Sequence, residues 1–395
     1  MAFCTVHAYA AVFLLAHGFT NTQVGVLLAL ANISSAVCQP LVAAVIDRKG
    51  FVTNRNFIMF SVFIILAGSL ILLAVQDNKI AVFVIYLIIY MIQFTYQPVM
   101  TALCFEYQKA GCDIMYGLSR GLGSAGFAVT SAMIGGLVEK KGVNVLLIVT
   151  AGAMAASLIV ILTFRRQGDV GVCQGDGSFG SRFTGTKRTV PPAKETTGPS
   201  PCLPRSSLTD FARAYPEYTL FLAGIICFFF AHNMINDFMI QIIRERGGAE
   251  TQLGIANFLQ AILELPVMAL IGAILKKVSA RNLLLVSSVA FFIKIMILIF
   301  THSMAGMYIS QSFQILAYAL FIPAAAYYVS ETMSEHDQVK GQAFITTAIT
   351  IGGIFSNFVS GRILDRLGVR PMLMTGAAVC FAGVIIAFIA MRKQR

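Results

Sequence analysis

Twelve long apolar segments constrain what this chain can fold into more than any other feature of its sequence. A helix needs about 20 predominantly apolar residues to cross the hydrocarbon core of a bilayer. The segments lie at about 2–17, 23–46, 56–75, 80–105, 114–138, 144–164, 217–243, 252–275, 282–300, 305–330, 341–361 and 371–391. The first is the shortest, and it lacks the basic leader and small-residue cleavage site of a signal peptide. We therefore predict an all-α membrane protein with twelve transmembrane helices.

The composition also indicates that lipid, rather than water, surrounds most of the chain. Only 12% of the residues are charged and 57% are hydrophobic, whereas soluble domains carry about 25% charged residues. The net charge of +11 would suit nucleic-acid binding in a soluble protein, but here we assign it to cytoplasmic loops and expect no nucleic-acid partner. The eight cysteines are scattered without a CxxC pair, so we predict neither a disulfide nor a metal site, and no cofactor.

One long polar stretch divides the chain into two parts. Residues 165–216 are rich in Gly, Ser, Pro and Thr, a composition that cannot bury a core. We predict a six-helix bundle over 1–164, a flexible cytoplasmic linker over 165–216 and a second six-helix bundle over 217–395. Placing the N-terminus inside puts most Lys and Arg residues in cytoplasmic loops, so we expect both termini to be cytoplasmic in a multi-pass plasma-membrane protein.

The two parts also contain similar short motifs in the same order. Thr22-Gln-Val-Gly25 opens the second apolar segment, and Thr251-Gln-Leu-Gly254 opens the eighth. Residues 135–142 end the fifth segment in the way that residues 361–368 end the eleventh. These matches predict two pseudo-symmetric bundles that arose by duplication. Such duplications place the substrate site between the halves, near the middle of the membrane.

The loop after the second segment carries a recognisable signature. Residues 43–50 read Ala-Ala-Val-Ile-Asp-Arg-Lys-Gly, which resembles the G-x-x-x-D-R-x-G loop of the major facilitator superfamily, with Ala43 in place of the leading glycine. The resemblance implies that Asp47 and Arg48 help to gate the cytoplasmic side. The alternative interpretation is an ordinary charged turn that obeys the positive-inside rule.

A second motif resembles one branch of that superfamily, the oligosaccharide–proton and nucleoside–proton symporters. The motif runs from Tyr116 to Phe127 and has the pattern aromatic-G-x-x-R-x-x-G-S-x-G-aromatic. The resemblance implies that Arg120 binds substrate hydroxyls together with Glu106, and that Phe127 stacks on the substrate. Glu106 lies at the cytoplasmic end of its segment, so an alternative is that water simply solvates it.

The tenth segment departs from that branch. The positions of its Lys, His and Glu proton relay are occupied here by Ile315, Tyr318 and Phe321, so proton coupling must use other groups. Glu264 lies about 18 Å into the eighth segment and Lys294 lies at a similar depth in the ninth. A charge inside a membrane is costly and usually functional. We predict that Glu264 carries the coupling proton and that Lys294 binds substrate, the alternative being a purely structural pair.

Other polar residues inside the segments extend this site. Asn233, Asn236 and Asp237 share one face of the seventh segment, and Gln314 lies on a polar stripe of the tenth. We assign substrate binding to Asn233, Asp237 and Gln314, with hydrogen bonding between helices as the alternative. His7 in the first segment is interpreted as a packed or interfacial residue.

The combined features predict a secondary active transporter, which is not an enzyme. We expect a small polar solute, a sugar or a nucleoside, to cross by proton symport and alternating access. The partners are then the solute, protons and the bilayer, and the protein is expected to be a monomer. One rival function is export of amphipathic compounds by proton antiport, and another is a membrane sensor that transports nothing.

Overall fold

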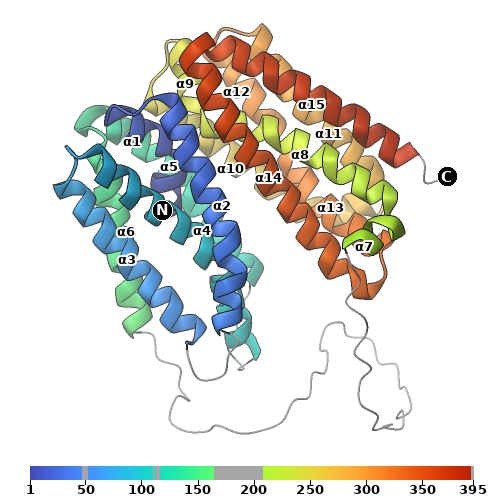
Figure 1. The fold of residues 1–395 in the computed structure, drawn as a ribbon, viewed down its shortest axis with the longest axis horizontal. Coiled ribbons are helices and arrows are strands. Elements are labelled where there is room, and N and C mark those ends of the chain that lie inside the picture. The colour runs from blue at the N-terminus through green and yellow to red at the C-terminus, as the bar shows by residue number, and fades with distance from the viewer. Residues whose placement is uncertain (47–51, 110–111, 113–115, 164–207, 393–395) are drawn as a thin grey trace, which may run out of the picture.

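The computed structural model describes residues 1–46, 52–109, 112, 116–163 and 208–392, and helices make up most of them (Figure 1). The helices of the N-terminal half are η1 Cys4–Ala8, α1 Ala10–Ala16, α2 Asn21–Ile46, α3 Asn54–Ala74, α4 Lys79–Lys109, α5 Tyr116–Lys141 and α6 Asn144–Thr163. Those of the C-terminal half are α7 Leu208–Ala214, α8 Pro216–Asp237, α9 Met239–Glu245, α10 Glu250–Leu275, α11 Ala280–Phe300, α12 Met304–Ser312, η2 Phe313–Ile315, α13 Tyr318–Thr332, α14 Glu335–Leu367 and α15 Val369–Arg392.

The predicted apolar segments are mostly helical in the part of the chain that the structure describes. Ten of the described helical stretches are long and apolar enough to cross a membrane, and the bent helix α10 raises the number to eleven. The bend lies next to Pro266, which cannot donate a backbone hydrogen bond inside the helix. The first predicted span consists of two short pieces, the π-helix η1 and the helix α1. The all-α prediction is therefore confirmed.

Two predicted spans of the C-terminal half are interrupted. Helix α8 ends at Asp237, and α9 continues after Phe238. The tenth predicted span is broken more fully, because the 3-10 turn η2 and two further residues separate α12 from α13. Backbone groups freed inside a membrane need new partners. At this break the Ser287 Oγ hydroxyl donates a 2.7 Å hydrogen bond to the carbonyl of Ala317.

The two halves meet through two helix pairs, α5 with α10 and α2 with α14. Glycine allows the backbones to approach closely in both pairs. A Cβ atom on Gly254 would overlap the carbonyl oxygen of Ser131, and one on Gly25 would overlap that of Asn357. The contacts are reciprocal, since Gly135 and Gly361 pack in the same way against the starts of α10 and α2. The motifs that repeat in the sequence therefore contain the glycines through which the two halves pack against each other.

Carboxylates from one half also cap helices of the other. The Asp365 carboxylate accepts hydrogen bonds from the backbone N–H groups of Asn21 and Thr22, at 3.0 and 2.7 Å. Glu139 accepts one from the N–H of Thr251, at 2.7 Å. Both carboxylates therefore lie at helix N-termini, where the helix dipole favours negative charge.

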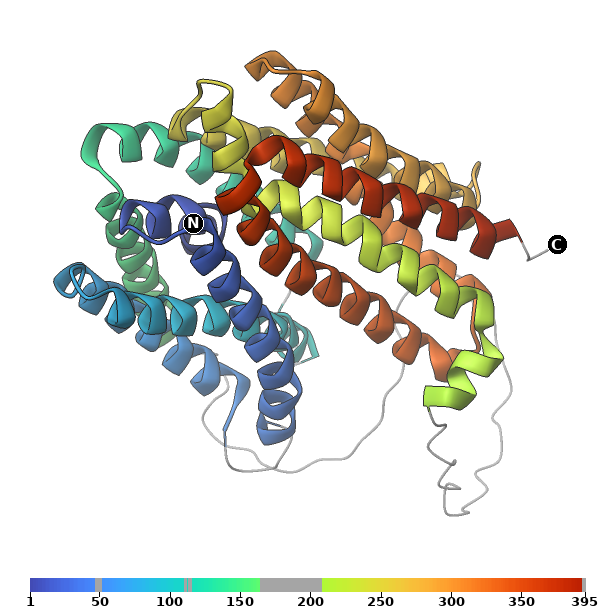
Figure 2. The same cartoon turned by 45° about the horizontal axis from the view of Figure 1, so that its top comes forward.

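These contacts all lie at the same end of the molecule. In Figures 1 and 2 the start of α2 lies beside the end of α14, and the two helices diverge toward the end of α2. The halves are therefore joined at the end that contains Asn21 and Thr251, and they separate toward the other end.

We predict that Gly254→Leu destabilises the protein by about 1–3 kcal/mol, because the added side chain overpacks the contact with Ser131. Gly272→Leu is the matched control on the same helix, since a Cβ there meets nothing within 4 Å. Thermal unfolding of both purified variants in one detergent measures the difference. Equal stability of the two variants would contradict the proposed close packing of the halves.

Candidate functional site

Polar side chains gather in the C-terminal half around the break between α12 and α13. The ammonium group of Lys294, a fully buried residue, donates a 2.8 Å hydrogen bond to Gln314 Oε1. Gln314 Nε2 in turn donates to Glu264 Oε1 at 3.4 Å. The Gln314 carboxamide thus bridges the two charged groups, and the roles predicted for Glu264 and Lys294 stay predictions.

A second chain of hydrogen bonds runs beside the first. Gln260 Nε2 donates to Asn236 Oδ1 at 3.0 Å and also to Gln311 Oε1. Asn236 Nδ2 lies 2.8 Å from His232 Nε2, and the His232 ring stacks on Tyr318 with centroids 5.1 Å apart. Helices α8, α10, α12 and α13 are therefore joined by polar side chains in the apolar interior.

Residue spacing explains why these groups meet. Gln260 and Glu264 are four residues apart and share one face of α10. Gln311 and Gln314 are three residues apart, and the second lies in the 3-10 turn that interrupts the tenth span. Each of the two α10 residues consequently faces one glutamine. We call the seven side chains of this assembly the polar network, namely His232, Asn236, Gln260, Glu264, Lys294, Gln311 and Gln314.

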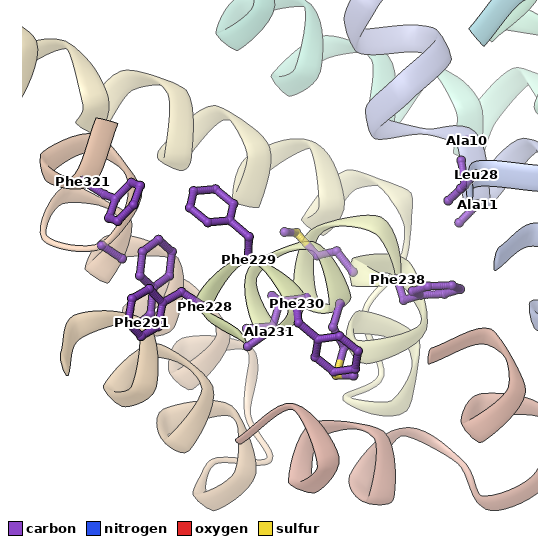
Figure 3. Packing of buried hydrophobic residues seen from close by; sticks show 14 of the residues in the cluster. Ala10, Ala11, Leu28, Phe228, Phe229, Phe230, Ala231, Phe238, Phe291 and Phe321 are labelled. Carbon is purple, nitrogen blue, oxygen red and sulfur yellow. The ribbon is translucent and has the colours of Figure 1, made fainter. Parts of the chain in front are cut away.

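Aromatic residues pack against the polar network. Figure 3 shows Phe228 and Phe229 of α8 beside Phe291 of α11 and Phe321 of α13. The Phe229 ring also lies 5.6 Å from that of His232. The Phe291 ring lies 5.5 Å from that of His232 as well, so the imidazole of the polar network packs between apolar rings.

The N-terminal half contributes a group of rings. Phe3 lies 4.1 Å from His7 and 6.4 Å from Phe127, measured between ring centroids. Tyr90 and Phe94 of α4 lie 3.9 and 4.4 Å from His7. We call these five residues the aromatic cluster. It includes Phe127, which was predicted to stack on substrate.

Asp237 lies at the boundary between the halves. Its carboxylate lies near Tyr90 of the aromatic cluster and also near the Asn357 side chain of α14. The polar residues that were predicted to share one face of the seventh span therefore contact two different neighbouring helices. Asn233 packs against Gly353 of α14, whereas Asn236 joins the polar network on the α10 side.

Several predicted site residues lie away from these groups or outside the description. Glu106 is exposed, and its carboxylate accepts a 2.9 Å hydrogen bond from Asn54 Nδ2. Arg120 belongs to α5, but its side chain is outside the described part of the chain, as are the residues Asp47 and Arg48. The contact of Arg120 with Glu106 and the cytoplasmic gate therefore stay predictions.

Sequence reasoning missed His232 and Gln260. Each lies four residues from a polar residue that was noticed, Asn236 and Glu264 respectively, so an i, i+4 search along each span would have found them. Among the described residues, no three His, Cys, Asp or Glu side chains are placed so that they could hold a metal ion.

Comparison with known proteins gives a family and a fold. The sequence model of the MFS_1 like family matches residues 2–374. The uncharacterized transporter YwbF of Bacillus subtilis (strain 168) is 24% identical over 171 residues, and the match spans 42% of each chain.

Solved structures resemble the whole chain. A mutant of the nucleoside transporter NupG has a TM-score of 0.75 at 14% identity, covering 100% of this chain and 97% of that one. NupG itself gives 0.71 at 15% identity, covering 100% and 98%. A bacterial homolog of the human lysosomal transporter Spinster gives 0.66 at 11% identity, covering 99% and 93%. These likenesses confirm the predicted fold of two six-helix bundles, and at such identities they establish the fold alone.

We predict that Gln314→Leu lowers the stability of the protein by about 1–3 kcal/mol, because it leaves the buried ammonium of Lys294 without this acceptor. The control is Gln342→Leu, whose side chain donates to the Ala326 carbonyl at an exposed position and should cost no more than about 0.5 kcal/mol. Thermal unfolding in detergent measures both. A Gln314 variant as stable as the control would show that the bridge contributes nothing.

Proposed function

The chain belongs to the MFS_1 like family, and we propose that it carries a small hydroxyl-bearing solute, of the sugar or nucleoside class, into the cell by proton symport. Its family and its structural relatives are transporters, so it is a membrane transporter of the major facilitator superfamily. Three points are proposals, namely the class of solute, the coupling ion and the direction in which the solute is transported.

The observation that carries this proposal is the polar network. Carboxamide groups both donate and accept hydrogen bonds, and Gln260, Gln311 and Gln314 place three of them beside Glu264 and Lys294. Such an array suits hydroxyl groups, which also donate and accept. An exporter of amphipathic compounds would be better served by an apolar binding surface.

The arrangement of the halves supports alternating access. The described contacts between them lie at the end that contains Asn21 and Thr251, and the halves diverge toward the other end (Figure 1). If both termini are cytoplasmic, as the basic loops predict, the joined end is the outer one. The structure then corresponds to a state open to the cytoplasm, and rocking of the halves would expose the site to the outside.

In the proposed cycle, Glu264 takes a proton from the outside, which removes its attraction for Lys294. The freed Lys294 and Gln314 then hydrogen-bond to solute hydroxyls from the C-terminal half. Asn233 and Asp237 contact the solute at the boundary, and Arg120 and Phe127 hold it from the other half. After the halves rock inward, Glu264 releases its proton to the cytoplasm, and the renewed attraction for Lys294 displaces the solute.

We predict that Glu264→Gln abolishes accumulation but keeps exchange. In proteoliposomes with an acidic exterior, uptake of labelled uridine or methyl galactoside against its gradient should fall at least tenfold, because glutamine cannot carry the proton. Exchange of labelled for unlabelled solute needs no net proton movement and should continue. Glu331→Gln, which changes an exposed carboxylate on α13, is the control and should accumulate solute as the wild type does.

Undiminished uphill uptake by the Glu264 variant at every pH would exclude the coupling role. Counterflow with an amphipathic cation, without counterflow of any sugar or nucleoside, would instead favour the exporter.

A further inference from the structure

A small pocket lies in the C-terminal half, at the end of the molecule that contains Thr251, and none of its lining residues belongs to the polar network. Its volume of about 40 Å³ is room for roughly three water-sized groups. The charged residues that line it are Arg246, Arg370 and Glu245, and His302 adds a ring nitrogen. Because two guanidinium groups face one carboxylate, the lining has a net positive charge. The pocket therefore suits a small anionic group.

Neutral carbonyl groups hold the Arg246 guanidinium in place. Its Nη1 donates to the Ile242 carbonyl at 2.8 Å, and its Nη2 donates to the carbonyls of Leu298 and Thr301 at 2.6 and 3.2 Å. The Nε atom is buried without a hydrogen-bond partner among the described residues. The carbonyl groups orient the side chain but carry no negative charge, so they leave its positive charge without a counterion.

The two arginines of the pocket differ in this respect from their neighbour Arg244. The Arg244 guanidinium forms an ion pair with Glu250, with an N–O distance of 2.6 Å. In the part of the chain that the structure describes, neither Arg246 nor Arg370 forms an ion pair. A partly buried charge without a counterion destabilises a protein. An anion bound between the two guanidinium groups would offset this cost.

The surroundings place the pocket where two membrane spans reach the lipid head groups. Leu298 and Leu373 line it from α11 and α15, which pack against each other. Exposed apolar residues lie next to both, since Phe300 at the end of α11 is 73% exposed and Met374 near the start of α15 is 56% exposed. On a membrane span such side chains face lipid, and the bilayer's polar region begins where the span ends. The pocket is thus at the depth of lipid phosphate groups.

We propose that this pocket binds the phosphate group of an anionic phospholipid such as phosphatidylglycerol. The planar guanidinium groups of Arg246 and Arg370 match phosphate oxygens, and the His302 ring can add an N–H donor. The single negative charge of the phosphodiester balances the net charge of two arginines and Glu245. Basic pockets between membrane helices bind lipid head groups in this way. The acyl chains would lie along the exposed apolar residues of α11 and α15.

Thermal unfolding of the purified full-length protein in a neutral detergent tests the site, with native mass spectrometry to count bound lipids. Added phosphatidylglycerol should raise the melting temperature of the wild type by several degrees. Arg370→Gln changes an exposed residue and should weaken lipid binding at least about fivefold. Glu245→Gln should strengthen it about threefold, because the acidic lining group is removed. Arg366→Gln, which changes an exposed arginine outside the pocket lining, is the control and should bind as the wild type does.

Three results would overturn the proposal. Equal loss of binding in Arg370→Gln and Arg366→Gln would show general attraction to a positive surface. Stabilisation by inorganic phosphate as large as that by phosphatidylglycerol, at one ionic strength, would show a site for a free anion. Equal stabilisation by phosphatidylcholine would show that the charge of the lipid is not recognised. The site does not depend on which solute is carried, so each of these results leaves the proposed function untouched.

Discussion

Inside the hydrocarbon core of a membrane, a polar group destabilises the protein unless another protein group bonds to it. This constraint explains why the described chain is helical, since a helix pairs its backbone groups internally. It also explains the exceptions. Where the tenth span is broken, the hydroxyl of Ser287 reaches across to the carbonyl of Ala317. Lys294, although wholly buried, has its ammonium group bonded to Gln314.

Two equivalent sets of contacts between the halves determine where the polar network and the aromatic cluster lie. Glycine-mediated contacts join α10 to α5 and α14 to α2, and a carboxylate of each half caps a helix of the other. Because these contacts are confined to one end, they fix the halves there and leave the opposite ends of α2 and α14 apart (Figure 2). The polar network belongs to one half and the aromatic cluster to the other, so a solute held by both would sense the movement of the halves.

Sequence reasoning predicted the spans well because the length of an apolar segment is a local property. It also placed Glu264 and Lys294 at one depth, since helical rise is constant. It did not predict the break at η2, because residues 312–317 contain neither glycine nor proline, and so the bridging role of Gln314 was not visible. His7 was interpreted as a packed or interfacial residue, since no sequence pattern reveals the π-helix in which it lies. Glu106 proves exposed and bonded to Asn54, a contact between the far ends of α3 and α4 that spacing alone does not indicate.

In the proposed cycle, proton binding at Glu264 and solute binding between the halves are coupled. Proton movement caused by the solute tests this claim most directly. A pH electrode in a lightly buffered suspension of proteoliposomes containing the wild-type protein would record it when uridine is added outside. The account predicts a rise in external pH as protons enter with the solute, and a collapse of that signal with a protonophore. Entry of labelled uridine without any change in pH, or with acidification of the medium, would contradict it.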